Sequence, residues 1–148
     1  MRALLQRVSK AKVEVDGRVA GEINNGLLLF LCAVKGDTDK DLDHLVKKVS
    51  QLRIFSDEQG KMNFSVQNVK GEVLVVSQFT LAATTRKGNR PSFDNAESPG
   101  RAKAFYETFI VKLRETGLLV RTGEFAASMA VSLVNDGPVT ILVDSREG

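Results

Sequence analysis

The stretch Val73–Leu81, VLVVSQFTL, decides how this chain folds, because an apolar run ends there abruptly in polar residues. A short continuous apolar run of this kind predicts a strand buried on both faces, which we expect to span Val73–Phe79. The polar residues at its end are Ser77, Gln78 and Thr80. Side chains at the end of a buried strand are held in fixed positions, which makes them candidates for a functional site.

A second stretch, Asn135–Thr140, reads NDGPVT and places Gly137 and Pro138 at the mouth of another apolar strand. Glycine tolerates a positive φ and proline can form a cis peptide, so the pair suits an unusual backbone shape. Only about 5–6% of X-Pro bonds in folded proteins are cis. The pattern alone therefore favours a tight turn between two strands.

Hydrophobic periodicity predicts an α/β fold in one domain over residues 1–148. Alternating apolar residues around Asp16 and Gly17 indicate a hairpin, and helical spacing predicts two main helices. Thr38 is the expected cap of the first helix, and the second begins at Ser98 and ends at Gly117. The expected strands are Leu4–Val8, the hairpin arms carrying Val13, Val15, Val19 and Ile23, Leu27–Val34, Arg53–Phe55, Val73–Phe79, Leu118–Arg121, Met129–Val134 and Val139–Val143. We expect mixed β-sheets with both helices on one face, in three layers, α/β/β.

The bulk composition fits a single globular domain. The chain has 148 residues, is 43% hydrophobic and carries a formal net charge of +3, which permits a nucleic-acid partner without requiring one. No apolar run approaches the roughly 20 residues of a membrane span. The N-terminal apolar stretch is too short for a signal peptide, so the expected location is cytoplasmic. The single cysteine, Cys32, lies in an apolar run and is interpreted as a buried small hydrophobic residue.

Several kinds of chemistry are excluded by residue type. One histidine and one cysteine cannot form an ordinary His/Cys metal site. His44 is expected on the solvated side of the first helix, which argues against a Ser-His-Asp triad. No glycine-rich nucleotide fingerprint or phosphate-binding loop is present. We therefore expect no metal and no cofactor.

The remaining candidates are hydroxyls, an amide and the main chain at the end of the Val73–Phe79 strand. On a strand, Gln78 and Thr80 would point one way and Ser77 and Phe79 the other. These polar side chains either bond locally at a strand end or form the floor of a pocket. Without a base nearby, Thr80 would be a poor nucleophile. Such a site suits a labile substrate, for which positioning and backbone N–H donors suffice.

A group of cations follows this strand. It comprises Arg86, Lys87, Arg90, Arg101 and Lys103. These side chains are either ordinary solvated surface charge or a rim that binds the phosphates of a nucleic acid beside the pocket.

The chain closely resembles the D-aminoacyl-tRNA deacylases over essentially its whole length. Each shared motif is short, but together they occur in order over one domain length. The shared motifs are Leu4–Val8, Leu52–Phe55, Gly60–Asn63, Ser77–Leu81, Thr85–Phe93, Thr122–Phe125 and Ser132–Thr140. One departure is Ala82, which follows the Ser77–Leu81 motif where many members carry tyrosine.

The resemblance implies an editing enzyme that hydrolyses the ester joining a D-amino acid, or mischarged glycine, to the terminal ribose of tRNA. It implies a homodimer with its active sites at the subunit interface. The Ser77–Leu81 motif would form the pocket of one subunit, and Gly137 and Pro138, joined by a cis peptide, would enter it from the other. Arg7 would brace this pair by hydrogen bonding.

The resemblance also implies a mechanism in which the 2′-hydroxyl of the tRNA assists the reaction. Backbone N–H groups near Phe79 and Thr80, with Gln78, would orient the substrate and stabilise charge, and Ser77 belongs to the same motif. Thr80 is the best candidate if a side chain contributes. The tRNA-binding residues would be Arg86, Lys87 and Arg90.

Two other kinds of protein remain compatible with the residues alone. One is a non-catalytic dimeric RNA-binding module, which the basic segment favours. The other is a small-molecule-binding protein that uses the same pocket. Ester cleavage with turnover would distinguish the enzyme from both.

Overall fold

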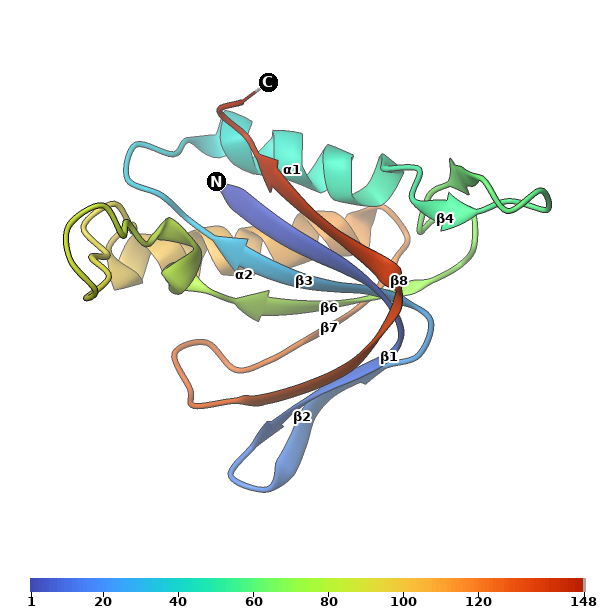
Figure 1. Ribbon diagram of the computed structural model, residues 1–148, viewed down its shortest axis with the longest axis horizontal. Coiled ribbons are helices and arrows are strands. Elements are labelled where there is room, and N and C mark those ends of the chain that lie inside the picture. The colour runs from blue at the N-terminus through green and yellow to red at the C-terminus, as the bar shows by residue number, and fades with distance from the viewer. Residues whose placement is uncertain (148) are drawn as a thin grey trace.

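A computed structural model describes residues 1–147 as a strongly curled mixed sheet covered by two helices (Figure 1). The fold class predicted from the sequence, α/β with two main helices, is confirmed. The elements are β1 (Arg2–Val15), β2 (Arg18–Ile23), β3 (Gly26–Cys32), α1 (Asp39–Gln51), β4 (Phe55–Ser56), β5 (Met62–Phe64), β6 (Glu72–Ser77), η1 (Phe79–Ala82), α2 (Pro99–Glu115), β7 (Leu119–Thr122) and β8 (Ala130–Asp144).

Strands β3 and β6 form the centre of the molecule and are buried on both faces. They pair in parallel, and their side chains alternate between two apolar cores. Leu29 and Val75 pack toward α1 and α2, whereas Leu28 and Leu74 pack toward the far half of the curled sheet. This double burial explains why both strands read as continuous apolar runs rather than as alternating patterns.

Strand β1 organises the rest of the sheet because it pairs with three others. Its first half is antiparallel to β3, its second half is antiparallel to β2, and β8 runs antiparallel along nearly all of it. The sheet bends along β1, so that β2 returns against β7 and the whole approaches a barrel (Figure 1). A single curled sheet thus covers the second face of β3 and β6, and a separate third layer stays a prediction.

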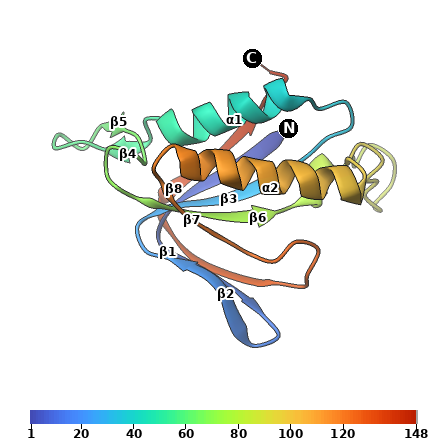
Figure 2. The same ribbon diagram turned by 180° about the vertical axis from the view of Figure 1, so that it is seen from behind.

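Helices α1 and α2 lie side by side on one face of the sheet (Figure 2). Thr38 caps α1 as expected, and its backbone N–H donates to the Asp41 carboxylate at 2.8 Å. The apolar face of α2 is buried, and Gly117 follows the helix with φ +92°. His44 is half-buried on α1, and Cys32 is buried as expected.

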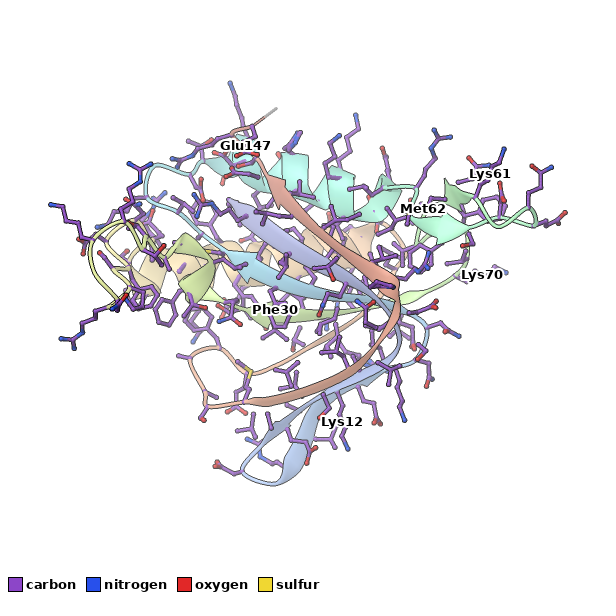
Figure 3. The ribbon with its side chains drawn as sticks, viewed as in Figure 1. Lys12, Phe30, Lys61, Met62, Lys70 and Glu147 are labelled. Carbon is purple, nitrogen blue, oxygen red and sulfur yellow. The ribbon has the colours of Figure 1, made fainter. Side chains whose placement is uncertain are left out.

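A small hairpin, β4–β5, projects from the end of the sheet, and Lys61 and Met62 point outward from it (Figure 3). The strand expected at Arg53–Phe55 is displaced, since β4 covers only Phe55 and Ser56. Among residues 1–147, no helix is both long enough and apolar enough to span a membrane.

Two further strand predictions are wrong in an informative way. The strand expected over Val73–Phe79 ends at Ser77, and the chain turns into the short helix η1. The two strands expected at Met129–Val134 and Val139–Val143 form one strand, β8, which bulges instead of turning back. In both places a polar or Gly-Pro segment is shaped by neighbours that are remote in sequence.

We expect Gly26→Ala to destabilise the fold, because β3 and β6 approach too closely there for any side chain. A Cβ on Gly26 would lie 1.8 Å from the carbonyl oxygen of Glu72 in the paired strand. Forcing the strands apart should lower the free energy of unfolding by about 3 kcal/mol. Urea denaturation followed by circular dichroism measures this change.

The matched control is Gly100→Ala in the first turn of α2, where an added Cβ has no neighbour within 4 Å. Alanine is a better helix former than glycine, so this variant should be at least as stable as the parent. Equal stability of the two variants would contradict the close packing of β3 on β6.

Candidate active site

The end of β6 is the first part of the candidate site. After Ser77 the chain leaves the sheet at Gln78, whose N–H donates to the Leu31 carbonyl at 2.8 Å. The following turn, η1, begins at Phe79. The first N–H groups of a helical turn have no carbonyl within the turn to bond, so those of Phe79 and Thr80 are available to a ligand.

The side chains of Gln78 and Thr80 do share one side, as predicted, but for a different reason. The Gln78 amide donates a hydrogen bond to the Thr80 hydroxyl across the turn rather than along a strand. Phe79 is exposed, and its ring meets that of Phe93 edge-on, with ring centroids 5.1 Å apart. The turn is therefore fixed from both sides.

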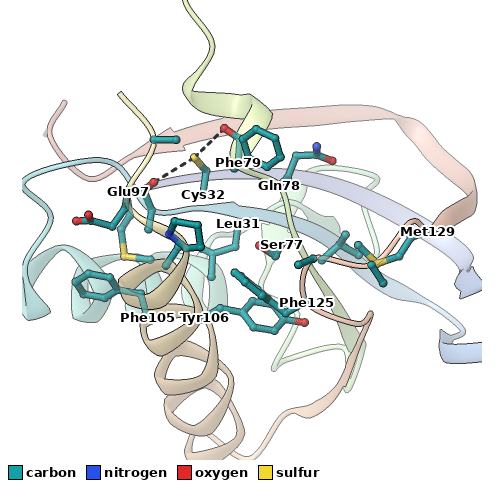
Figure 4. A pocket seen from close by; sticks show the side chains of 18 of the residues that line it. Leu31, Cys32, Ser77, Gln78, Phe79, Glu97, Phe105, Tyr106, Phe125 and Met129 are labelled. Atoms are coloured by element: carbon teal, nitrogen blue, oxygen red, sulfur yellow. Dashed lines mark hydrogen bonds between the residues drawn. The ribbon is translucent and has the colours of Figure 1, made fainter. Parts of the chain in front are cut away.

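A cavity of about 490 Å³ opens beside this turn (Figure 4). Ser77, Gln78 and Phe79 line one edge of it, while Thr80 is not among its lining residues. The rest of the wall is mostly apolar and comes from β3, α2 and the segment before β8. Its larger members include Phe105, Tyr106, Phe125 and Met129.

Sequence reasoning missed this wall, because its residues are scattered over the chain. No pattern in the sequence brings Tyr106, on the second predicted helix, together with Phe125, in the Thr122–Phe125 motif. In the structure their rings lie 5.6 Å apart, and the Tyr106 hydroxyl donates to the Val75 carbonyl at 3.3 Å. Burial raises the pKa of Tyr106, so its hydroxyl stays protonated near neutrality.

Cys32 lies at the back of the cavity, where its thiol is within 3.7 Å of the Phe79 carbonyl (Figure 4). Burial is the largest influence on this thiol and raises its pKa. A protonated, buried thiol is a poor nucleophile, so Cys32 packs rather than reacts. Ala82 is buried next to it, together with Val34.

The second part of the site is the loop around Gly137 and Pro138, midway along β8. The peptide bond between these residues is cis, and both are exposed. The pairing of β8 with β1 is interrupted there. Gln6 pairs with Thr140 and Val8 pairs with Asn135, so that Arg7 alone on β1 lies opposite residues 136–139 of β8. The loop therefore stands out from the sheet as a bulge.

Arg7 reaches across this interruption. Its Nε donates to the Asp136 carbonyl at 2.8 Å, and its Nη1 donates to the Ile54 carbonyl at 2.8 Å. The Asp136 carboxylate lies 3.6 Å from the same guanidinium. Arg7 thus holds the main chain one residue before Gly137 by a hydrogen bond, and its role as a brace of the Gly137–Pro138 pair stays a prediction.

The two parts of the site do not meet within one chain. No residue of 135–140 lines the cavity beside η1. The bulge lies near the middle of β8, whereas η1 follows the opposite end of β6 (Figure 1). Any site that uses both segments needs a second copy of the chain.

The predicted basic rim is a loop next to η1. Its ends are joined by backbone hydrogen bonds between Thr84 and Ser92 at 2.8 and 2.9 Å. Arg86, Lys87 and Arg90 are exposed on it, and none forms an ion pair within residues 1–147. In contrast, Arg101 pairs with Glu97, which precedes α2, and Lys103 pairs with Glu107 on α2.

Comparison with known proteins agrees with this geometry. The family model described as D-Tyr-tRNA(Tyr) deacylase matches residues 4–144. Relatives named D-aminoacyl-tRNA deacylase from Aquifex aeolicus and Thermotoga petrophila are 58% and 59% identical over 147 residues, and each alignment covers 99% of both chains.

Two solved structures share the fold. One, titled c-Myc DNA Unwinding Element Binding Protein, has a TM-score of 0.92 and 42% identity and covers 97% of this chain and 98% of its own. The other, titled as a probable eukaryotic D-amino acid tRNA deacylase, has a TM-score of 0.83 at 17% identity, with the same coverage. The chain therefore belongs to the D-Tyr-tRNA(Tyr) deacylase family and is a D-aminoacyl-tRNA-hydrolysing enzyme.

Proposed function

We propose that this enzyme cleaves D-aminoacyl-tRNA and mischarged glycyl-tRNA and rejects L-aminoacyl-tRNA by means of the loop at Gly137 and Pro138. The observation that carries the proposal is an exposed stretch of main chain braced by Arg7 from the neighbouring strand. A D-residue and an L-residue differ only in where hydrogen and side chain sit on one carbon. A rigid segment of main chain beside that carbon can leave room for hydrogen and clash with an L side chain. In the proposal this segment, called the wedge below, is formed by Gly137 and Pro138.

This kind of selection does not depend on which side chain the substrate carries. The wedge excludes a position in space and recognises no functional group. Glycine has no side chain to clash, so glycyl-tRNA passes the same filter. One enzyme can in this way clear many D-amino acids from tRNA.

The proposed working form is a homodimer in which each loop enters the cavity of the partner subunit. Two features support it. The cavity beside η1 receives no residue of the bulge in its own chain. The strand that carries the bulge, β8, exposes apolar side chains, with Val134 and Leu142 45% and 56% accessible. Burial of such side chains against a second copy would stabilise the dimer.

The proposed substrate position places the terminal adenosine of tRNA in the apolar cavity and the ester beside η1. Aromatic side chains such as Phe105 and Phe125 offer faces on which a base can stack. The ester would then lie near Gln78 and the N–H groups of Phe79 and Thr80. These donors suit the negative charge that develops on a carbonyl oxygen during hydrolysis.

The chemistry is proposed to use the 2′-hydroxyl of the tRNA rather than a protein nucleophile. The only side-chain hydroxyls at the turn belong to Ser77 and Thr80, and Thr80 accepts its hydrogen bond from the Gln78 amide instead of donating to a base. An aminoacyl ester is already labile, so orientation and charge stabilisation account for the catalysis that is required.

The body of the tRNA is proposed to lie along the basic rim formed by Arg86, Lys87 and Arg90. These side chains have no ionic partner within the described residues and flank the turn that would hold the ester. Phosphate contacts of this type position a nucleic acid without reading its sequence. Because tRNA charging takes place in the cytoplasm, that is the proposed location of the enzyme.

We expect Gly137→Ala to impair chiral selection. A Cβ on Gly137 would lie 2.2 Å from the Val139 nitrogen, so the loop must change shape to accept it. Misplacement of a positioning group by about 1 Å can cost about 100-fold in rate, and we expect a loss of that order with D-tyrosyl-tRNA. The ratio of D to L cleavage should fall as well.

The measurement is the release of labelled D-tyrosine and L-tyrosine from charged tRNA, with Gly100→Ala as a folded control. An unchanged D-to-L ratio in Gly137→Ala would overturn the proposed role of the loop.

Thr80→Ala should retain appreciable activity, because the proposed catalytic groups at this turn belong to the main chain. We expect a loss below about tenfold, well short of the 100- to 1,000-fold cost of losing an oxyanion donor. Single-turnover deacylation of D-tyrosyl-tRNA provides the rate. Complete loss of cleavage with intact tRNA binding would point to a side-chain nucleophile.

Replacing Arg86, Lys87 and Arg90 together by glutamine should weaken tRNA binding without changing the chemical step. Three lost phosphate contacts should reduce the slope of log K against log salt by about 2 to 3. Filter binding over a salt series measures this slope.

A triple glutamine variant at Lys40, Lys47 and Lys48 on α1 changes the net charge equally and serves as the control. If both triple variants shift the slope alike, the rim is ordinary surface charge and not the tRNA contact.

A further inference from the structure

Asn135 stands at the entrance to the bulge and closes it with its side chain. Its Oδ1 accepts a hydrogen bond from the Val139 N–H at 3.0 Å, and its Nδ2 donates to the Val139 carbonyl at 3.0 Å. The same Nδ2 lies 3.5 Å from the Thr140 hydroxyl oxygen. One amide thus satisfies both main-chain groups of Val139, four residues further along the strand.

These bonds replace the pairing that β1 cannot supply. Val8 pairs with Asn135 and Gln6 pairs with Thr140, so Val139 has no counterpart on β1. Val139 is also buried, and unpaired main-chain groups in a buried position are costly. An asparagine amide carries a carbonyl acceptor and an NH2 donor group at the spacing of a peptide group, which allows it to stand in for a strand partner.

The closure explains why position 137 is glycine. An added Cβ there would lie 2.2 Å from the Val139 nitrogen and 3.1 Å from the Asn135 Oδ1. The loop is therefore folded directly over the hydrogen bond between the Asn135 side chain and the Val139 N–H. Gly137 and Asn135 therefore act together, since a substitution of either residue disturbs the hydrogen bond between the Val139 N–H and the Asn135 side chain.

We propose that Asn135 is a positioning residue for chiral selection by the enzyme. Its amide fixes the far end of the loop at Val139, while the Arg7 guanidinium fixes the near end at the Asp136 carbonyl. Gly137 and Pro138 lie between these two anchors and cannot shift independently of them. Without the Asn135 amide, the main chain at Gly137 and Pro138 can move, so that L-aminoacyl esters are no longer excluded from the site.

This inference rests on the proposed function of the loop, so the experiment must separate the two. It compares kcat/KM for D-tyrosyl-tRNA and L-tyrosyl-tRNA in Asn135→Ala, Asn135→Asp and Gly137→Ala. Asn135→Asp keeps the size and the acceptor of the side chain but loses the donor to the Val139 carbonyl. We expect the D-to-L ratio to fall at least about tenfold in both Asn135 variants, as the loss of one or two hydrogen bonds warrants.

Asn68→Ala is the matched control for a purely structural asparagine. The Asn68 Oδ1 accepts a hydrogen bond from the Ser65 N–H at 2.9 Å, in a turn that contributes nothing to the cavity. This variant should lose stability to a similar degree and keep the D-to-L ratio of the parent. A change in the ratio thus distinguishes positioning from general stabilisation.

The outcomes are separable. If Gly137→Ala changes the ratio and soluble Asn135→Asp does not, the inference on Asn135 is overturned and the proposed function stands. If Gly137→Ala leaves the ratio unchanged, the proposed function of the loop fails, and the inference on Asn135 fails with it. Hydrogen exchange on the parent protein is a further test that needs no variant. The Val139 amide should exchange slowly, and fast exchange would contradict the hydrogen bond from the Val139 N–H to Asn135.

Discussion

The structure depends above all on the larger of two irregularities in the pairing of β1 with β8, the one at Arg7. On either side of this residue β1 and β8 are paired, but between Gln6 and Val8 the two strands advance by different amounts. The surplus residues of β8 are pushed out of the sheet as a loop, and their main-chain groups lose their partners. The strand behind the loop is itself held firmly, since Arg7 pairs with Leu27 of β3 on its other side.

The same strand also supports the other part of the site. Arg2, near the start of β1, donates from Nη1 to the Leu81 carbonyl at 2.7 Å and pairs with Asp144 at 3.2 Å. The turn η1 is thus tied to β1 as the loop is. Before it, the Met1 ammonium group bonds the buried Asp37 carboxylate at 2.7 Å, which places the Met1 side chain in the cavity wall. The positions of turn, loop and cavity are therefore all set relative to β1.

Local patterns predicted much of this architecture and missed the features that make the site. Hydrophobic spacing predicts the buried faces of α1 and α2 and the double burial of β3 and β6. The cap at Thr38 follows from its residue type. Both signals depend only on residues that are near in sequence. The end of β6 was placed two residues too late, because alternating polar residues are equally compatible with a strand and with a tight helical turn. The segment around Gly137 suggested a turn, since nothing in it indicates that β1 runs past on one side. The cavity wall has no local signature at all, because β3, α2 and the segment before β8 come together only in the folded chain.

In a site that is built from main-chain groups, specificity depends on how accurately the surrounding structure positions those groups. Every residue contributes a main-chain carbonyl, so no single substitution removes a carbonyl from the loop. What a substitution can change is where that group lies, and three residues govern this most directly. Arg7 bonds the Asp136 carbonyl, Asn135 closes the loop, and Gly137 leaves space for that closure. In the proposed function the wedge lies against the α-carbon, which all amino acids share. Selection then depends on where the wedge lies and not on a particular side-chain group. The ordered hydrogen bonds around Arg7 and Asn135 supply that position at a place where the sheet itself cannot.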